Sequence, residues 1–157
     1  MVGKEHPKYE QAKMTVVGSM SAFYPETERI MGWDINQNGF KIVLSGDVPS
    51  LVQEKVPSGV KRFLDRYQFE LSDIGEVIAH PGGPKVLDAL TNALSVDSSW
   101  LRHSWESLAK NGNMSSVSVL DILSRTLKTP IEESKLGILM AMGPAFCSEM
   151  VLTKRIP

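Results

Sequence analysis

The arrangement of apolar and polar positions divides the chain into short segments of two kinds. Continuous or alternating apolar residues predict β-strands, and apolar residues at intervals of three or four predict amphipathic helices. On this basis strands are expected over residues 13–19, 39–45, 76–79, 136–142 and 150–154, and helices over residues 47–67, 84–94, 98–109 and 114–127. Because strands alternate with helices, the sequence predicts an α/β fold in which helices cover a sheet.

Turn-forming residues interrupt this pattern. Residues 21–38 contain several of them and are expected to form a loop. The strand at 76–79 stops at a His-Pro-Gly-Gly turn, and Pro84 then suits the first turn of a helix because it has no N–H to leave unpaired. Pro57 falls inside the segment 47–67, where it predicts a kink or a break.

Composition predicts one ordered globular unit. The 157 residues are 42% apolar, which is enough for the core of a single domain spanning residues 1–157. The 17 basic and 18 acidic residues nearly balance and form no long runs, so neither nucleic acid nor an anionic membrane surface is an expected partner. Residues 4–10 are polar where a signal peptide would be apolar, and no segment is long enough to span a membrane. A soluble, cytoplasmic protein is therefore expected.

Cys147 is the only cysteine, so the chain can form no intramolecular disulfide and no cysteine-based zinc cluster. The three histidines lack metal-ligand spacing, and no metal site is expected. No basic residue adjoins Cys147 to stabilise a thiolate, so it is interpreted as a small buried residue rather than a nucleophile. The other rings are interpreted as packing residues in the case of Trp33, Trp100 and Trp105, and as solvated groups in the case of His6 and His103.

His80 is the first candidate for chemistry. It follows a predicted buried strand and precedes a glycine-rich turn and a helix start, a position where α/β folds often hold reactive groups. Gly82 and Gly83 would let a ligand approach the backbone closely, and the helix N-terminus favours an anionic group. A lone histidine is nevertheless usually structural, so the residues alone leave both interpretations open.

Asn113 is the second candidate, because it stands directly before a predicted helix. Asparagine is among the best helix-capping residues, and this interpretation is favoured on the residues alone. The alternative is that its amide donates a hydrogen bond to a substrate carbonyl.

Several short segments are similar to motifs of one known family. Residues 78–87 (IAHPGGPKVL) and 112–119 (GNMSSVSV) resemble its histidine and asparagine motifs, and residues 141–146 (AMGPAF) resemble its glycine-rich closing motif. Residues 31–34 (MGWD) and 39–49 (GFKIVLSGDVP) are similar to its bacterial members. The family is that of the type III polyketide synthases, which includes chalcone and stilbene synthases. The motifs occur in the family's order and spacing over nearly the whole chain.

The resemblance implies a thiolase-like layered α/β fold, a homodimer, and acyl- and malonyl-coenzyme A as substrates, with no further cofactor. It implies an acyltransferase that extends a starter acyl group by decarboxylative Claisen condensation. His80 and Asn113 would then be catalytic, because two donors aimed at the malonyl thioester oxygen stabilise the charge that develops there. His80 would also keep the family's nucleophilic cysteine as a thiolate. That cysteine belongs to an N-terminal half expected upstream of Met1, and Cys147 does not occupy its position.

The resemblance also implies substrate and coenzyme A contacts, which fall on Gly82, Gly83, Ser115, Ile42, Trp33, Gly143 and Pro144. Ile42 aligns with a phenylalanine that gates the cavity of chalcone synthase, and Trp33 falls near a cavity-lining glycine. Specificity is therefore expected to differ from that of a chalcone synthase. Ala141 and Ala145 replace glycines of the closing motif, and their methyl groups predict negative φ angles and a differently shaped loop.

Other functions remain open at the level of sequence. A ketoacyl synthase that initiates fatty-acid synthesis also uses a histidine and an asparagine, although the Pro-Gly-Gly after His80 favours the polyketide branch. A non-catalytic dimerisation or scaffold module would fit a chain without the nucleophile. A hydrolase built on Cys147 and His80 is the weakest alternative. The isolated chain is expected to be inactive.

Overall fold

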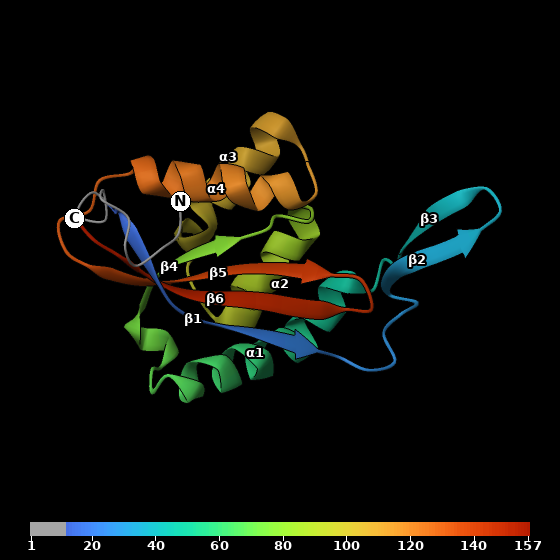
Figure 1. Ribbon diagram of the computed structural model, residues 1–157, viewed down its shortest axis with the longest axis horizontal. Coiled ribbons are helices and arrows are strands. Elements are labelled where there is room, and N and C mark those ends of the chain that lie inside the picture. Colours follow the sequence, from blue (N-terminus) through green and yellow to red (C-terminus); the bar gives the residue numbers. More distant parts are fainter. Residues whose placement is uncertain (1–11) are drawn as a thin grey trace.

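The computed structural model describes residues 12–157, which form both strands and helices, as the sequence predicts (Figure 1). In chain order the elements are β1 (Met14–Phe23), β2 (Met31–Asn36), β3 (Gly39–Leu44), α1 (Val48–Arg66), the 3₁₀ turn η2 (Leu71–Asp73), β4 (Ile74–Ala79), α2 (Pro84–Leu94), the 3₁₀ turn η3 (Ser98–Leu101), α3 (Arg102–Asn111), α4 (Ser116–Lys128), β5 (Lys135–Gly143) and β6 (Cys147–Arg155).

The main sheet has four strands in the order β1-β6-β5-β4. β6 is antiparallel to both of its neighbours, whereas β4 and β5 are parallel. Parallel neighbours need a crossover connection, and here α2, α3 and α4 supply it between β4 and β5. The sequence prediction of an α/β fold with helices packed on the sheet is therefore confirmed, and the sheet is mixed.

The helices pack in two groups (Figure 1). α1 packs against α2 and contacts β1 and β6, while α3 packs against α4 and both contact β4. α1 buries its apolar face at helical spacing, with Val52, Val56 and Phe63 fully buried. Pro57 lies inside α1 and does not end it, so the helix continues where the sequence predicted a kink or break. Burial of Val56 and Val60 on either side favours the continued helix.

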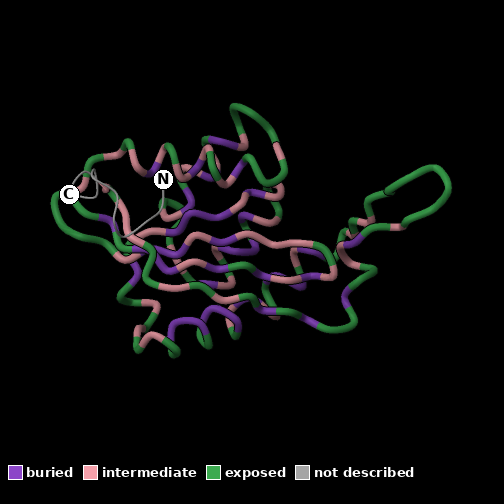
Figure 2. The backbone as a smooth tube through the Cα atoms, viewed as in Figure 1, coloured by how far each residue is buried: buried purple, intermediate pink, exposed green. Residues whose placement is uncertain are grey.

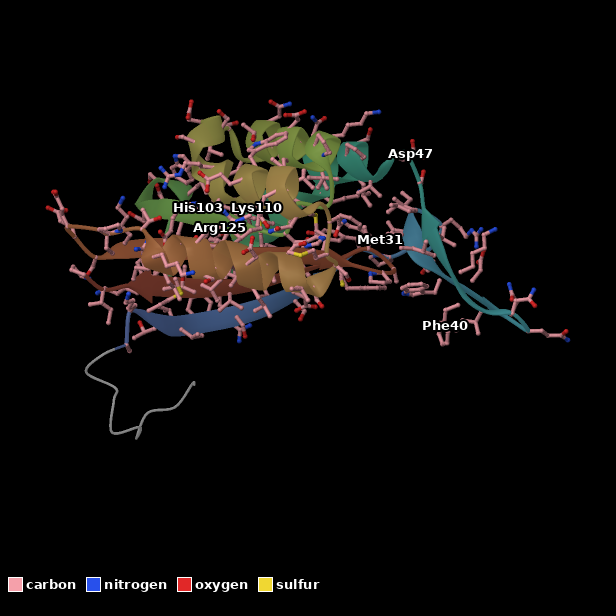
Figure 3. All side chains as sticks on the ribbon, turned by 90° about the horizontal axis from the view of Figure 1, so that it is seen from above. Met31, Phe40, Asp47, His103, Lys110 and Arg125 are labelled. Atoms are coloured by element: carbon pink, nitrogen blue, oxygen red, sulfur yellow. The ribbon has the colours of Figure 1, made fainter. Side chains whose placement is uncertain are left out.

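The loop predicted over residues 21–38 is the main error of the sequence analysis. β1 continues to Phe23, and β2 occupies the second half of the segment and pairs with β3 as an antiparallel hairpin. Apolar and polar residues do alternate along β2, but Gly32 and Asn36 were read as turn formers. The hairpin projects from the body of the molecule (Figures 1 and 3) and is exposed over most of its length (Figure 2).

The predicted helix over residues 98–109 is divided into η3 and α3. The Asp97 side chain caps η3 by accepting a hydrogen bond from the Ser99 backbone N–H at 2.9 Å. Trp100 and Trp105 pack against the core, as expected. His103 is only 18% exposed and bonds to Glu106 and Thr129, so the expectation that it is solvated was wrong. His6 lies outside the described residues.

No helix within residues 12–157 combines the length and the apolar character needed to cross a lipid bilayer.

Candidate active site

His80 follows the last residue of β4, at the carboxyl end of a strand buried on both sides. Ile78 and Ala79 have no exposed surface, and the His80 backbone N–H donates to the Met140 carbonyl of β5 at 2.9 Å. This bond extends the β4–β5 pairing by one residue, so the sheet fixes the backbone that carries the imidazole. The position agrees with the prediction of a histidine at the end of a buried strand.

Partial burial favours the uncharged form of the His80 ring. Desolvation lowers the pKa of His80 below its ordinary value, because the charged imidazolium loses hydration when it is buried. Near neutral pH the ring is therefore uncharged, with one nitrogen that donates a hydrogen bond and one that accepts. A neutral imidazole of this kind can donate to a developing oxyanion.

In the turn after His80, the backbone conformation requires glycine at position 82 but not at position 83. Gly82 has φ of 52°, which L-residues rarely adopt, and a Cβ there would lie 3.3 Å from the Val86 side chain. Gly83 is extended, and a Cβ there would meet no atom within 4 Å. The Gly83 carbonyl accepts from the Val86 N–H at 3.0 Å and so starts α2.

Asn113 lies in the short connection between α3 and α4. Its Nδ2 donates to the Gly82 carbonyl at 2.8 Å, and its Oδ1 accepts from the Ser115 backbone N–H at 2.8 Å. Ser115, not Asn113, occupies the N-cap position of α4, so the capping interpretation of Asn113 was wrong. The amide instead joins the asparagine loop to the turn after His80.

A cavity of about 670 Å³ brings these two loops to one place. Of the residues singled out from the sequence, its lining includes Trp33, Ile42, His80, Gly82, Gly83, Asn113, Ser115 and Pro144. Gly143 adjoins Pro144 but does not line the cavity. Segments from the hairpin, the turn after β4, the loop before α4 and the turn before β6 therefore meet around His80.

The hairpin supplies the apolar wall of the cavity. Trp33 of β2 and Ile42 of β3 pair directly, so their side chains share one face of the hairpin. Trp33 also meets Phe40 edge-to-face, with ring centroids 6.2 Å apart. Trp33 is 50% exposed, so it packs on the hairpin surface beside the cavity and not in the core. In Figure 3, Met31 marks the base of the hairpin and Phe40 lies toward its tip.

The turn between β5 and β6 differs from the sequence expectation. Ala145 has φ of 57°, although its methyl group predicted a negative value, whereas Ala141 is not among the residues with positive φ. The Ala145 N–H donates to the Met31 carbonyl at 2.7 Å. This bond to the base of the hairpin holds the alanine in a conformation that usually requires glycine.

Sequence reasoning missed several cavity residues. The lining also includes Met31, Leu44, Lys85, Val86 and Met142. Met31 and Leu44 share the hairpin face of Trp33, so the period-two pattern of the two strands was the signal that could have found them. Lys85 lies in the first turn of α2, two residues after Gly83, and this closeness to the glycine-rich turn was the signal that could have found it.

Cys147 begins β6, is half-buried and is not among the residues that line the cavity with His80. This placement agrees with a structural cysteine. Within residues 12–157 no three His, Cys, Asp or Glu side chains are grouped so that they could hold a metal ion.

Comparison with known proteins gives a consistent result. Residues 15–157 match the family model described as chalcone and stilbene synthases, C-terminal domain. The chain is 40% identical over 143 residues to 1,3,6,8-tetrahydroxynaphthalene synthase of Streptomyces peucetius subsp. caesius, a match that covers 88% of this chain and 37% of that protein. It is 36% identical over 138 residues to a putative chalcone synthase of Bacillus subtilis, covering 87% of this chain and 38% of that one.

Among solved structures, 1,3,6,8-tetrahydroxynaphthalene synthase from Streptomyces coelicolor, a bacterial type III polyketide synthase, superposes with a TM-score of 0.84 at 30% identity. The match covers 92% of this chain and 41% of that chain. The mixed sheet and its helices thus have the thiolase-like fold of type III polyketide synthases. The chain belongs to the chalcone and stilbene synthase family. It spans well under half the length of the relatives it matches.

Proposed function

We propose that this chain forms the C-terminal part of a type III polyketide synthase that condenses a starter acyl-coenzyme A with malonyl-coenzyme A. The observation that carries the proposal is that His80 and Asn113 line the same cavity. Coenzyme A thioesters are the substrates in this proposal, and no metal or further cofactor takes part.

Decarboxylation of malonyl-coenzyme A places negative charge on the thioester oxygen. The bond between the malonyl α-carbon and its carboxylate breaks, carbon dioxide leaves, and the electron pair forms an enolate whose charge lies on the thioester oxygen. Hydrogen bonds from His80 and Asn113 to that oxygen lower the barrier. Asn113 has two amide hydrogens, and one is used by the Gly82 carbonyl, so the other is available for substrate.

The enolate carbon then attacks the carbonyl carbon of a starter acyl group held as a thioester, and the cysteine thiolate leaves. In our proposal an N-terminal half of the same enzyme supplies this cysteine, in agreement with the greater length of the relatives. The isolated chain should then neither load an acyl group nor extend one. We further propose a homodimeric, cytoplasmic enzyme, as the family resemblance implies.

The test is malonyl-coenzyme A decarboxylation by the full-length synthase carrying His80→Ala or Asn113→Ala. Each variant should lose about 10²- to 10³-fold in rate, because each removes one donor to the developing oxyanion. Thermal unfolding checks that the variants remain folded. Wild-type rates in both variants would overturn the proposal and favour a non-catalytic dimerisation or scaffold module instead.

Two control variants sharpen the test. His103→Gln changes a histidine bonded to Glu106 and Thr129, outside the lining of this cavity, and should keep the wild-type rate. Cys147→Ser should also keep the wild-type rate. Loss of activity in this variant would instead support a nucleophilic role for Cys147.

A further inference from the structure

One carboxylate oxygen joins α3 to α4, the two helices that flank the loop carrying Asn113. Oδ2 of Asp121, on α4, accepts from Ser107 Oγ at 2.7 Å and from Asn111 Nδ2 at 3.1 Å, both on α3. The same oxygen accepts from Arg125 Nε, one turn along α4, at 2.8 Å. Figure 3 labels Arg125 on α4, and Figure 1 shows the two helices above the sheet.

The hydrogen bonds from Ser107 and Arg125 to Asp121 Oδ2 are partly buried, unlike an ion pair on an exposed surface. Ser107 is fully buried, and the Asp121 and Arg125 side chains are 27% and 24% exposed. The hydrogen bond from Arg125 and the one from Ser107 lower the pKa of Asp121, so the group is a carboxylate at neutral pH. A carboxylate with several donors fixes their relative positions, whereas an apolar contact would only hold the helices together.

The connection that this carboxylate spans is short and strained. Residues 112–115 join the end of α3 to the start of α4. Gly112 has φ of 69°, and Ser115, which is not a glycine, has φ of 56°. A non-glycine residue in that region costs about 1–3 kcal/mol and persists only when its surroundings hold it. The placement of the loop therefore depends on how its two flanking helices are tied together.

We propose that Asp121 is a positioning residue for Asn113. Its carboxylate fixes the last turn of α3 against α4, and the loop between them then presents the Asn113 amide to the cavity. Asp121 does not line the cavity, so it acts only through this loop. The proposal rests on the proposed function, in which Asn113 donates to the malonyl thioester oxygen.

The experiment is a double-mutant cycle on malonyl-coenzyme A decarboxylation by the full-length synthase. Asp121→Ala should lower kcat by about ten- to a hundredfold with KM little changed, because a misplaced donor weakens the transition state more than substrate binding. In the Asn113→Ala background the same substitution should have almost no further effect, since the group that it positions is already gone. A merely structural loss would lower the rate equally in both backgrounds.

Two further variants complete the cycle. Asp121→Asn keeps the shape of the side chain and one accepting oxygen, so it should fold even if Asp121→Ala does not. Its rate should lie between those of the wild type and Asp121→Ala. In the Asn113→Ala background, Asp121→Asn should have almost no further effect on the rate. Asp65→Ala removes the corresponding carboxylate of an exposed pair at the same spacing on α1, where Lys61 Nζ lies 2.8 Å from Asp65, and should leave kcat unchanged.

The outcomes separate this proposal from the function on which it rests. If Asn113→Ala keeps the wild-type rate, the proposed function fails and the positioning role fails with it. If Asn113→Ala is slow but both Asp121 variants either keep the rate or lower it equally in both backgrounds, only the positioning role is overturned.

Discussion

The side-chain amide of Asn113 donates a 2.8 Å hydrogen bond to the backbone carbonyl of Gly82, which joins the loop before α4 to the turn after β4. The two loops carry the two proposed donors, His80 and Asn113, and are separated in the chain by α2 and α3. Their relative position therefore depends on the conformation of Gly82 as well as on the side chains themselves.

Gly82→Ala should disturb this arrangement from the backbone side. An alanine at φ of 52° costs about 1–2 kcal/mol, and its Cβ would press on Val86 at 3.3 Å. The turn should relax and move the carbonyl that holds Asn113. We expect a lower thermal unfolding midpoint and a fall in malonyl-coenzyme A decarboxylation larger than the stability loss explains.

Gly83→Ala is the matched control for stability. Gly83 is extended, and its Cβ would meet nothing within 4 Å, so the thermal midpoint should stay near that of the wild type. If both alanine variants unfold at the wild-type temperature, the claim that Gly82 is under a conformational constraint is wrong.

The sequence predicted the elements of the main sheet, because buried strands and amphipathic helices have clear periods. Its motifs identified eight of the residues that line the cavity. It did not predict that β2 and β3 form a hairpin. The apolar residues of β2 do alternate with others, but two of those others, Gly32 and Asn36, are residue types that also form turns. Ala145 could not be predicted either. Its positive φ depends on a bond to the Met31 carbonyl, more than 100 positions away in the chain.

The same limit applies to Asp121. Its spacing from Arg125 suggests an ordinary ion pair along a helix, and only the tertiary packing of α3 on α4 brings Ser107 and Asn111 to the same oxygen.

His80 should make the stability of the protein sensitive to mild acid. Because its pKa is lower in the folded than in the unfolded state, the unfolded chain takes up the proton first as the pH falls. Stability is therefore unaffected above the ordinary histidine value of about 6.5, falls as the pH drops through it, and the loss is complete below the folded-state pKa. Thermal unfolding of the full-length protein at about pH 7.5 and about pH 5.5 measures this difference.

His80→Gln is the comparison that isolates the imidazole, because glutamine does not titrate. The wild type should lose more of its thermal midpoint between the two pH values than this variant does. Equal losses would mean that burial of the His80 ring does not disfavour its protonation.

The apolar face of the hairpin provides the last prediction. Trp33 lines the cavity and pairs with Ile42, whereas Ile35 lies on the same face two residues farther along β2, is 72% exposed and is not among the lining residues. From this position Trp33 is expected to limit the space for the starter acyl chain. Trp33→Ala should therefore raise kcat/KM for long over short acyl-coenzyme A starters by about tenfold, the lower end of the effect of one methylene group in an apolar pocket. Malonyl-coenzyme A decarboxylation should change little, because His80 and Asn113 are retained. Ile35→Ala should leave the starter preference unchanged, and an equal shift in both variants would show that the whole hairpin face, rather than Trp33, sets the limit.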